Sequence, residues 1–376
     1  MEHHRDSKKP LPLDRVRVLD MSRVLAGPMA GMMLGDLGAD VIKVERTGQG
    51  DETRAWGPPF DERNESAYFL SVNRNKLSLA ADFADQRDRD CIRRLVSEAD
   101  IVIDNFLPGM LTRHGLHVAE LLDANPKLVW CTITGFGAGS RRLGYDFVVQ
   151  AEAGWMAITG DPAGDPMKSG VALADIIAGK DAVIAILAAL VRRDASPASA
   201  RRLVVSLAHS ARAALVNVAQ NALVSGEHPA RWGNAHPNLV PYQLFQAQDR
   251  AIVIAVGSDA QWQALTEVLD LKRLGADPDL ATNAGRIARR SEVVAAISAA
   301  VASRSASEWQ QKLDAARVPC GIVKGVLDAI EDAAHASPLM GMPSSIGGRV
   351  RFPPPRLDEH GSLIRGAGWS VFGRYP

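Results

Sequence analysis

The chain has 376 residues, more than one hydrophobic core usually serves, so its length predicts two domains or one large domain with an insertion. Its 43 basic and 43 acidic residues cancel, which argues against a nucleic-acid partner and requires any polyanion site to use a few local Arg and Lys side chains. The three cysteines are widely spaced and lack metal-ligand spacing, which argues against a disulfide framework and a zinc site. No apolar run of about 18 residues is present, which argues against a membrane span. Together these features predict a cytoplasmic protein.

The first 45 residues predict a β-α-β unit. Residues 16–20 (VRVLD) have the pattern of a buried strand, a helix is expected from Ala26 until Gly38 stops it, and residues 40–45 (DVIKVE) form a second strand. A dinucleotide-binding unit has the same order of elements. However, the first turn has the sequence SRVLAGPMAG instead of G-x-G-x-x-G, so a nicotinamide cofactor is not expected.

Three later apolar runs, 99–103, 128–134 and 203–207, are expected to extend a parallel sheet. The first two are followed by the polar or Gly-rich loops DNFLPG and GFGAG. Ligands of such sheets bind at the carboxyl edge, where these loops lie.

The composition changes at residues 225–243, which are rich in Pro, Gly, His and Asn and are typical of a domain junction. Beyond it, a strand at 251–256 and a helix opened by a capping box at Ser305 and Glu308 predict a smaller α+β unit. The expected division is a large domain at 1–225, a small α+β domain at 226–330, and a return to the large domain at 331–376.

Asp175 is a carboxylate with apolar neighbours, in the stretch GVALADIIAG. Burying it costs roughly 1–3 kcal/mol unless hydrogen bonds or a partner compensate. One interpretation is a helix N-cap, because Val183, Ile186, Leu187 and Leu190 follow with helical spacing. Another is a functional carboxylate at a helix start, where free N–H groups stabilise developing negative charge, and the two interpretations are compatible.

Seven short stretches follow one another along the chain: RVLAGP, LGADVIKVE, GDETR, NRNK, DNFLPG, GYD and GVALAD. Together they resemble the class III CoA-transferases, the family of formyl-CoA transferase and carnitine CoA-transferase, from about residue 16 to about residue 335. The likeness is greatest to the succinyl-CoA:glutarate (dicarboxylate) type, in ERTGQGDETRAWGPPF, SVNRNK and GNAHPNLVPYQ. The resemblance implies an α/β fold with a Rossmann-like large domain built on a parallel sheet, a smaller α+β domain, and a homodimer of interlocked rings.

The resemblance also implies the reaction, in which CoA moves from an acyl-CoA donor, expected to be succinyl-CoA, to a small dicarboxylate. Asp175 matches the position of the family's nucleophile, which forms a mixed anhydride and then an aspartyl-CoA thioester. Apolar neighbours suit this role because water would hydrolyse both intermediates. The CoA thioester is a substrate here, and no permanently bound cofactor and no metal are expected.

A CoA site is implied by the same resemblance. In a chain without net charge, Arg46 and Lys76 are the strongest candidates to hold the CoA phosphates, with Arg74 and Arg113 as further ones. The expected CoA-binding residues are Leu25, Ala26, Arg46, Asn73, Arg74, Asn75, Lys76, Asn105, Phe106, Leu107, Arg113, Leu143, Gly144, Tyr145 and Asp146.

The chain departs from the family pattern in two ways. The glycine run that formyl-CoA transferase folds over its intermediate is missing, so residues 234–238 or 137–139 are expected to shield the site. The closing segment also looks shorter than in the family.

Two alternative functions share this fold. An α-methylacyl-CoA racemase would need a histidine base where this chain has Tyr145, and phenols titrate near about 10, too high for a base at neutral pH. A non-catalytic CoA-binding protein would be expected to lack the nucleophile, whereas Asp175 is present.

Overall fold

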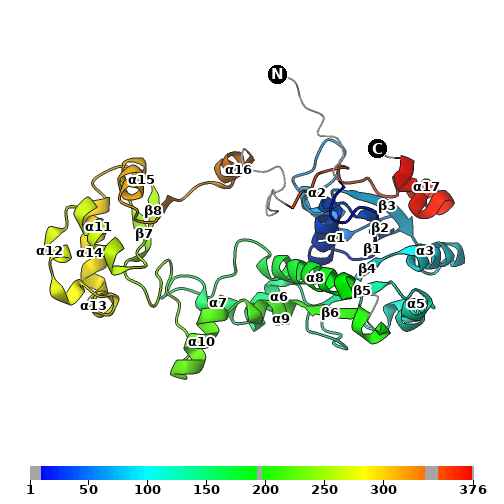
Figure 1. Ribbon diagram of the computed structural model, residues 1–376, viewed down its shortest axis with the longest axis horizontal. Helices are drawn as coiled ribbons and strands as arrows, with labels where there is room; N and C mark the ends of the chain where they lie inside the picture. Colours follow the sequence, from blue (N-terminus) through cyan, green and yellow to red (C-terminus); the bar gives the residue numbers. More distant parts are fainter. Residues whose placement is uncertain (1–9, 193–196, 335–345, 375–376) are drawn as a thin grey trace, which may run out of the picture. The chain divides into compact units, whose positions relative to one another are not determined.

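The computed structural model describes residues 10–192, 197–334 and 346–374 (Figure 1). Contacts divide the chain into two compact units. Unit 1 contains the segments up to 155, 168–226 and from 337 onward, and unit 2 contains 156–167 and 227–336. The sequence placed residues 156–167 with the first domain, whereas in the structure Arg231 of unit 2 donates hydrogen bonds to the carbonyl oxygens of Asp161 and Gly164.

Unit 1 is built on a six-stranded parallel sheet with the strand order β3-β2-β1-β4-β5-β6. The order reverses between β1 and β4, where Val18 pairs with Ile101. Loops that leave neighbouring strands diverge at such a point and open a crevice at the carboxyl edge. The strands are β1 (Arg17–Asp20), β2 (Asp40–Arg46), β3 (Lys76–Ala81), β4 (Ile101–Asp104), β5 (Val129–Thr134) and β6 (Arg202–Ser206).

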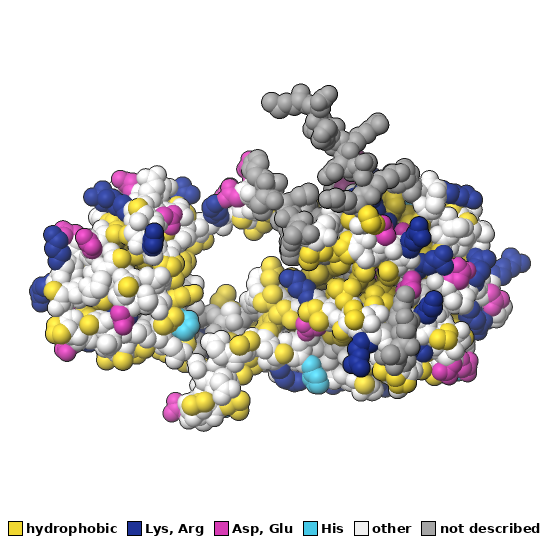
Figure 2. Space-filling view, viewed as in Figure 1, with side chains coloured by type: hydrophobic (Ala, Val, Ile, Leu, Met, Phe, Trp, Pro, Cys, Tyr) yellow, Lys and Arg dark blue, Asp and Glu magenta, His cyan; other side chains and the backbone are white. Residues whose placement is uncertain are grey.

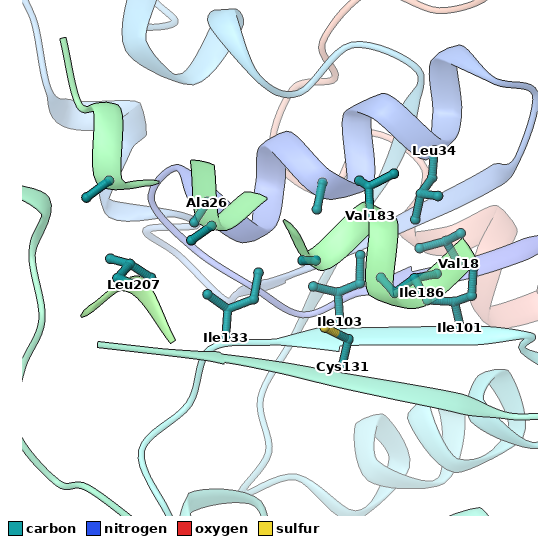
Figure 3. Packing of buried hydrophobic residues seen from close by; sticks show 14 of the residues in the cluster. Val18, Ala26, Leu34, Ile101, Ile103, Cys131, Ile133, Val183, Ile186 and Leu207 are labelled. Atoms are coloured by element: carbon teal, nitrogen blue, oxygen red, sulfur yellow. The ribbon is translucent and has the colours of Figure 1, made fainter. Parts of the chain in front are cut away.

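Successive strand residues face two separate cores, because side chains alternate across a sheet. Val18, Ile101 and Cys131 point into the core covered by α1 and α8 (Figure 3). Their neighbours Leu19 and Val102 point into the core covered by α3, α5 and the C-terminal segment. The sheet is thus buried on both faces, as its nearly continuous apolar strands predict.

Helices cover both faces of the sheet and lie in the segments that connect its strands. Those of unit 1 are α1 (Ala26–Asp36), α2 (Ala67–Ser71), α3 (Gln86–Glu98), α4 (Met110–Arg113), α5 (Val118–Ala124), α6 (Asp146–Glu152), α8 (Leu173–Arg192), α9 (Leu207–Ala213), α10 (Val216–Ser225) and α17 (Gly361–Ala367), with 3-10 turns η1 (Glu52–Ala55), η3 (Ala198–Arg201) and η5 (Gly368–Arg374). The short helix α7 (Trp155–Ile158) begins at the last residue of the first segment of unit 1.

Unit 2 packs helices against an antiparallel sheet of order β7-β8-β9. The expected capping box forms, because Ser305 accepts from the backbone of Glu308 and the Glu308 side chain accepts from Ser305. Its elements are β7 (Tyr242–Gln246), β8 (Ala251–Ala255), β9 (Cys320–Ile322), α11 (Asp259–Val268), α12 (Lys272–Gly275), η4 (Pro278–Leu280), α13 (Asn283–Ala288), α14 (Arg290–Val301), α15 (Ala306–Ala315) and α16 (Val326–Ala334).

The α/β class, the parallel sheet and the smaller antiparallel unit agree with the sequence prediction. Strands β3, β7 and β9 were not predicted. The interlocked dimer stays a prediction.

Candidate active site

Two adjoining cavities lie in unit 1 at the carboxyl edge of the parallel sheet. We name them the Arg46 cavity, of about 350 Å³, and the Asp175 cavity, of about 180 Å³, after one residue that lines each. Arg23, Phe106 and Leu107 line both cavities, so the two cavities share a wall. Its walls come from the loops that follow β1 and β4, at the point where the strand order reverses.

Asp175 lies in the first turn of α8 and its residue surface is 9% exposed. Burial, and secondly the negative charge of Asp146, raise the pKa of Asp175 to about 7. The N-cap interpretation is wrong, because the helix begins at Leu173, before Asp175. The first-turn N–H of Ala174 instead donates to the carboxylate of Asp146, over 2.8 Å. The Asp175 carboxylate itself remains on the cavity wall.

Asp146 is part of a small network that fixes the start of α8. Its second oxygen accepts from Gln150 at 2.6 Å, and Gln150 in turn accepts from the backbone of Ser169 at 2.8 Å. The expected CoA-binding residue Asp146 lines neither cavity; it orients α8 and places a second negative charge near Asp175.

Most of the expected CoA-binding residues come together at these two cavities. Arg46 and Arg113 are exposed at the Arg46 cavity, which Phe106 and Leu107 also line. Those that line the Asp175 cavity are Leu25, Ala26, Asn105, Phe106, Leu107, Leu143, Gly144 and Tyr145.

The residues Asn73 to Lys76 lie elsewhere, and the phosphate role expected for Lys76 needs correction. Lys76 is the first residue of β3 and is fully buried, and its ammonium group donates to Asp20 at 2.8 Å, to the Pro28 carbonyl at 2.7 Å and to Asn73 at 2.9 Å. All three of its donors are therefore used inside the protein.

Arg74 and Asn75 also have internal partners. Arg74 forms two hydrogen bonds with Asp36 at the end of α1, at 2.9 and 2.7 Å. Asn75 donates to Asp36 and to the carbonyl of Arg349, and thereby ties α1 to the C-terminal segment. The NRNK stretch thus links α1, β3 and the C-terminal segment through hydrogen bonds.

Sequence reasoning missed Tyr68, whose hydroxyl interacts with the charge of Asp175. Tyr68 packs in a small apolar cluster with Leu25 and Ala172, and its ring meets Trp56 edge-on with 5.1 Å between centroids. Burial, and then the negative charge of Asp175, raise the pKa of Tyr68 to about 12, so its hydroxyl stays protonated at neutral pH. The only sequence signal was the position of these aromatics between the GDETR and NRNK stretches.

Arg23 was also missed, although it lies inside the RVLAGP stretch. Its guanidinium is half-exposed at the junction of the two cavities and forms an ion pair with Glu52 at 3.2 Å. It adds a third arginine to this edge of the sheet, beside Arg46 and Arg113.

Within the described ranges, no group of three or more His, Cys, Asp or Glu residues is placed to hold a metal ion. No helix in the same part of the chain combines the length and the apolar character needed to cross a membrane.

Comparisons with known proteins agree with this fold. The model of CoA-transferase family III matches residues 13–360. Succinyl-CoA:glutarate CoA-transferase of Mus musculus is 39% identical over 357 residues, which cover 94% of this chain and 81% of that protein. Succinate--glutarate CoA-transferase of Agrobacterium fabrum is 41% identical over 334 residues, covering 87% and 83%. A crystal structure of a CAIB/BAIF family protein from Brucella suis has a TM-score of 0.83 and 38% identity, covering 95% and 99%.

The chain belongs to CoA-transferase family III and is an enzyme that transfers CoA. The predicted family and enzyme class are therefore confirmed. The racemase alternative also lacks support from the site, because no histidine is among the described residues that line the Asp175 cavity.

Proposed function

We propose that the enzyme transfers CoA from succinyl-CoA to a small dicarboxylate, with Asp175 as the nucleophile. The observation that carries this proposal is a buried carboxylate on the wall of the cavity at the sheet edge. The donor and acceptor classes rest on the names of the relatives, which join succinate or succinyl-CoA with glutarate.

The reaction starts when the Asp175 carboxylate attacks the acyl carbon of the donor thioester and CoA thiolate leaves, which gives a mixed anhydride. The thiolate then attacks the Asp175 carbonyl of the anhydride, forms the aspartyl-CoA thioester and releases the donor acid. The acceptor carboxylate displaces CoA from Asp175 and forms a second anhydride. The returning thiolate attacks the acceptor's acyl carbon, which completes the new thioester and frees Asp175.

The two cavities have different roles in this proposal. The phosphates of CoA lie in the Arg46 cavity, where Arg46 and Arg113 supply positive charge, and the thioester reaches Asp175 past Phe106 and Leu107. CoA is bound as a substrate, with no permanently held cofactor. Residues 137–139 follow β5 and lie between Gly135 and Ser140, which line the Asp175 cavity, so they are candidates to shield the intermediate.

The first test replaces the nucleophile. Asp175→Ala and Asp175→Asn are expected to fold and to bind CoA, because a buried charge is removed and packing is kept, while exchange falls at least about a thousandfold. Wild-type enzyme with succinyl-CoA and a panel of acids, followed by mass spectrometry of acyl-CoA products, identifies the acceptor. Hydroxylamine during turnover is expected to convert Asp175 to a hydroxamate, and substantial turnover by either variant would refute the proposal.

The second test concerns the phosphates. Arg46→Ala is expected to raise the KM of every acyl-CoA by a similar factor, about tenfold, and to leave acceptor preference unchanged. Arg74→Ala is the matched control, since its guanidinium is paired with Asp36 away from both cavities. Equal KM effects of the two variants, or acceptor-dependent effects of Arg46→Ala, would contradict the assignment.

The proposal includes an interlocked homodimer in the cytoplasm. The chain passes between its two units more than once, which is the path that linked rings require. Helix α10 has no buried residue, and its Leu223 and Val224 are 78% and 79% exposed. Hydrophobic side chains also gather on the face of unit 1 that carries α1 and α8 (Figure 2), which is typical of surface that a second subunit covers. The free thiols Cys91, Cys131 and Cys320 suit a reducing compartment.

A further inference from the structure

The turn between β1 and α1, residues Ser22 to Val24, is held by side chains from other strands. Lys43 in β2 donates to the carbonyl oxygen of Ser22 at 3.0 Å. The carboxylate of Asp51, in the loop after β2, accepts from the backbone N–H of Val24 at 3.3 Å. Lys43 and Asp51 are themselves paired at 3.0 Å. One ion pair thus binds both ends of the turn.

The middle residue of the turn is held in the same way. Asn105, just after β4, accepts from the N–H of Arg23 at 3.0 Å and donates to its carbonyl oxygen at 2.8 Å. The amide of Asn105, expected to bind CoA, is therefore used on the protein backbone. Since Arg23 lines both cavities, the conformation of this turn sets the wall that the cavities share.

The turn needs such support because its last residue is in an unfavourable conformation. Val24 has a φ of 72°, in the left-handed region that β-branched residues avoid. A residue in this state costs roughly 1–3 kcal/mol and persists only when its surroundings impose it. The residues that follow, Leu25 and Ala26, line the Asp175 cavity and open α1.

Lys43 and Asp51 are among the residues that line the Arg46 cavity, yet neither side chain offers free surface to a ligand there. Both side chains have 0% exposed surface. Burial disfavours their charged forms, but their mutual attraction, together with the charges of Asp20 and Glu45 near Lys43 and the Thr53 hydrogen bonds to Asp51, outweighs burial. The pKa of Lys43 is therefore raised and that of Asp51 lowered from the ordinary values. Asp51 also accepts from Thr53, at 3.0 Å from the N–H and 2.8 Å from the hydroxyl. The pair is thus a fixed, charged anchor within the wall of the Arg46 cavity, which both residues line.

We infer that Lys43 and Asp51 are positioning residues, which hold the strained Ser22–Val24 turn in the form that admits acyl-CoA to the two cavities. This inference rests on the proposed placement of CoA. Without the anchor, Val24 relaxes to a negative φ, Arg23 and Leu25 are displaced, and only a fraction of the molecules remains competent to bind. The apparent affinity for CoA then falls by that fraction.

The test measures CoA binding by calorimetry, together with kcat and KM for succinyl-CoA, in the full-length enzyme. Asp51→Asn is expected to weaken CoA binding and raise KM about tenfold, with kcat changed less than about threefold. Glycine adopts a positive φ without strain, so Val24→Gly combined with Asp51→Asn is expected to restore KM to within about threefold of wild type. A purely structural role for the pair predicts no such rescue.

Glu65→Gln is the matched control. It breaks the buried Arg54–Glu65 pair, 2.7 Å long, which contacts no backbone of the turn, so stability can fall while KM stays unchanged. Should Asp51→Asn fail to fold, Lys43→Met with Asp51→Asn removes both charges and leaves none unpaired. The same KM increase and glycine rescue are expected of it.

An unchanged KM in these variants, or an increase that Val24→Gly does not reverse, would overturn the inference. If Arg46→Ala weakens CoA binding but Asp51→Asn does not, only this inference fails. If Arg46→Ala has no effect on CoA binding, the proposed placement of CoA fails, and the inference fails with it.

Discussion

Asp175 combines two requirements that oppose each other. A nucleophilic carboxylate must be ionised, yet its shelter from water disfavours the ionised form. Burial and the nearby charge of Asp146 raise its pKa to about 7, so near neutral pH both forms are populated. Because only the ionised form attacks a thioester, the activity of the free enzyme is expected to rise with pH through this value.

Asp146→Asn tests the contribution of the second charge. The amide oxygen can still accept from the first turn of α8, which keeps that contact, while the like-charge repulsion is removed. The amide nitrogen cannot accept, so the hydrogen bond from Gln150 is lost. The acidic limb of the kcat/KM profile is expected to move to lower pH, by up to about one unit. Glu120→Gln, an exposed acid on α5, serves as the control and should leave the limb in place. A limb that stays fixed or moves to higher pH in Asp146→Asn would refute this electrostatic account.

At the residue scale, sequence reasoning identified the side chains that line the two cavities better than the side chains that hold the cavity walls in place. Arg46 and Asp175 lie in stretches that resemble the family, so the resemblance together with the local pattern predicted their roles. Lys76 was misassigned because β3 was not recognised, and its partner Asp20 is 56 residues away in the chain. Such long-range pairing has no local signal.

Helices α1 and α8 pack closely where the active site begins. A Cβ atom on Gly179 would lie 2.8 Å from the carbonyl oxygen of Ala26, closer than such contacts allow. Gly179 therefore permits the approach of the two helices, one turn after Asp175. Both helices begin at the wall of the Asp175 cavity, so their separation determines where the nucleophile lies.

Gly179→Ala is expected to destabilise the protein by about 1–3 kcal/mol, because overpacking outweighs the gain in helix propensity. It should also lower kcat, since α8 and Asp175 shift together. Urea unfolding and steady-state kinetics measure the two effects. Gly366→Ala in α17 is the matched control: no atom lies within 4 Å of its added methyl, so stability should be unchanged or slightly raised. A Gly179→Ala enzyme as stable and as fast as wild type would contradict the packing argument.

At the element scale, the periodic apolar runs predicted most strands of the sheet and its parallel arrangement. The start of α8 was harder, because the group that accepts from its first turn is Asp146, which is remote in sequence, while local reasoning considered only Asp175. Strand β7 was missed because the run Tyr242–Gln246 mixes exposed and buried residues inside a segment rich in turn formers.

For the whole molecule, the path of the chain constrains how subunits can assemble. Unit 2 consists of residues 156–167 and 227–336, so the chain enters and leaves it twice. If two such chains are linked as rings, separation requires one chain to unfold and thread out of the other. Dissociation would then be as slow as unfolding, whatever the protein concentration.

Subunit exchange distinguishes linked rings from an ordinary dimer. Two preparations with different affinity tags, mixed at nanomolar concentration in native buffer, are expected to form no doubly tagged dimers over days, because the rings cannot open while the chains stay folded. Unfolding the mixture in urea and refolding it should produce doubly tagged dimers, which shows that the tags permit pairing. Steady exchange in native buffer with full activity would contradict interlocking while leaving the catalytic proposal intact, since Asp175 and both cavities lie within a single unit of one chain.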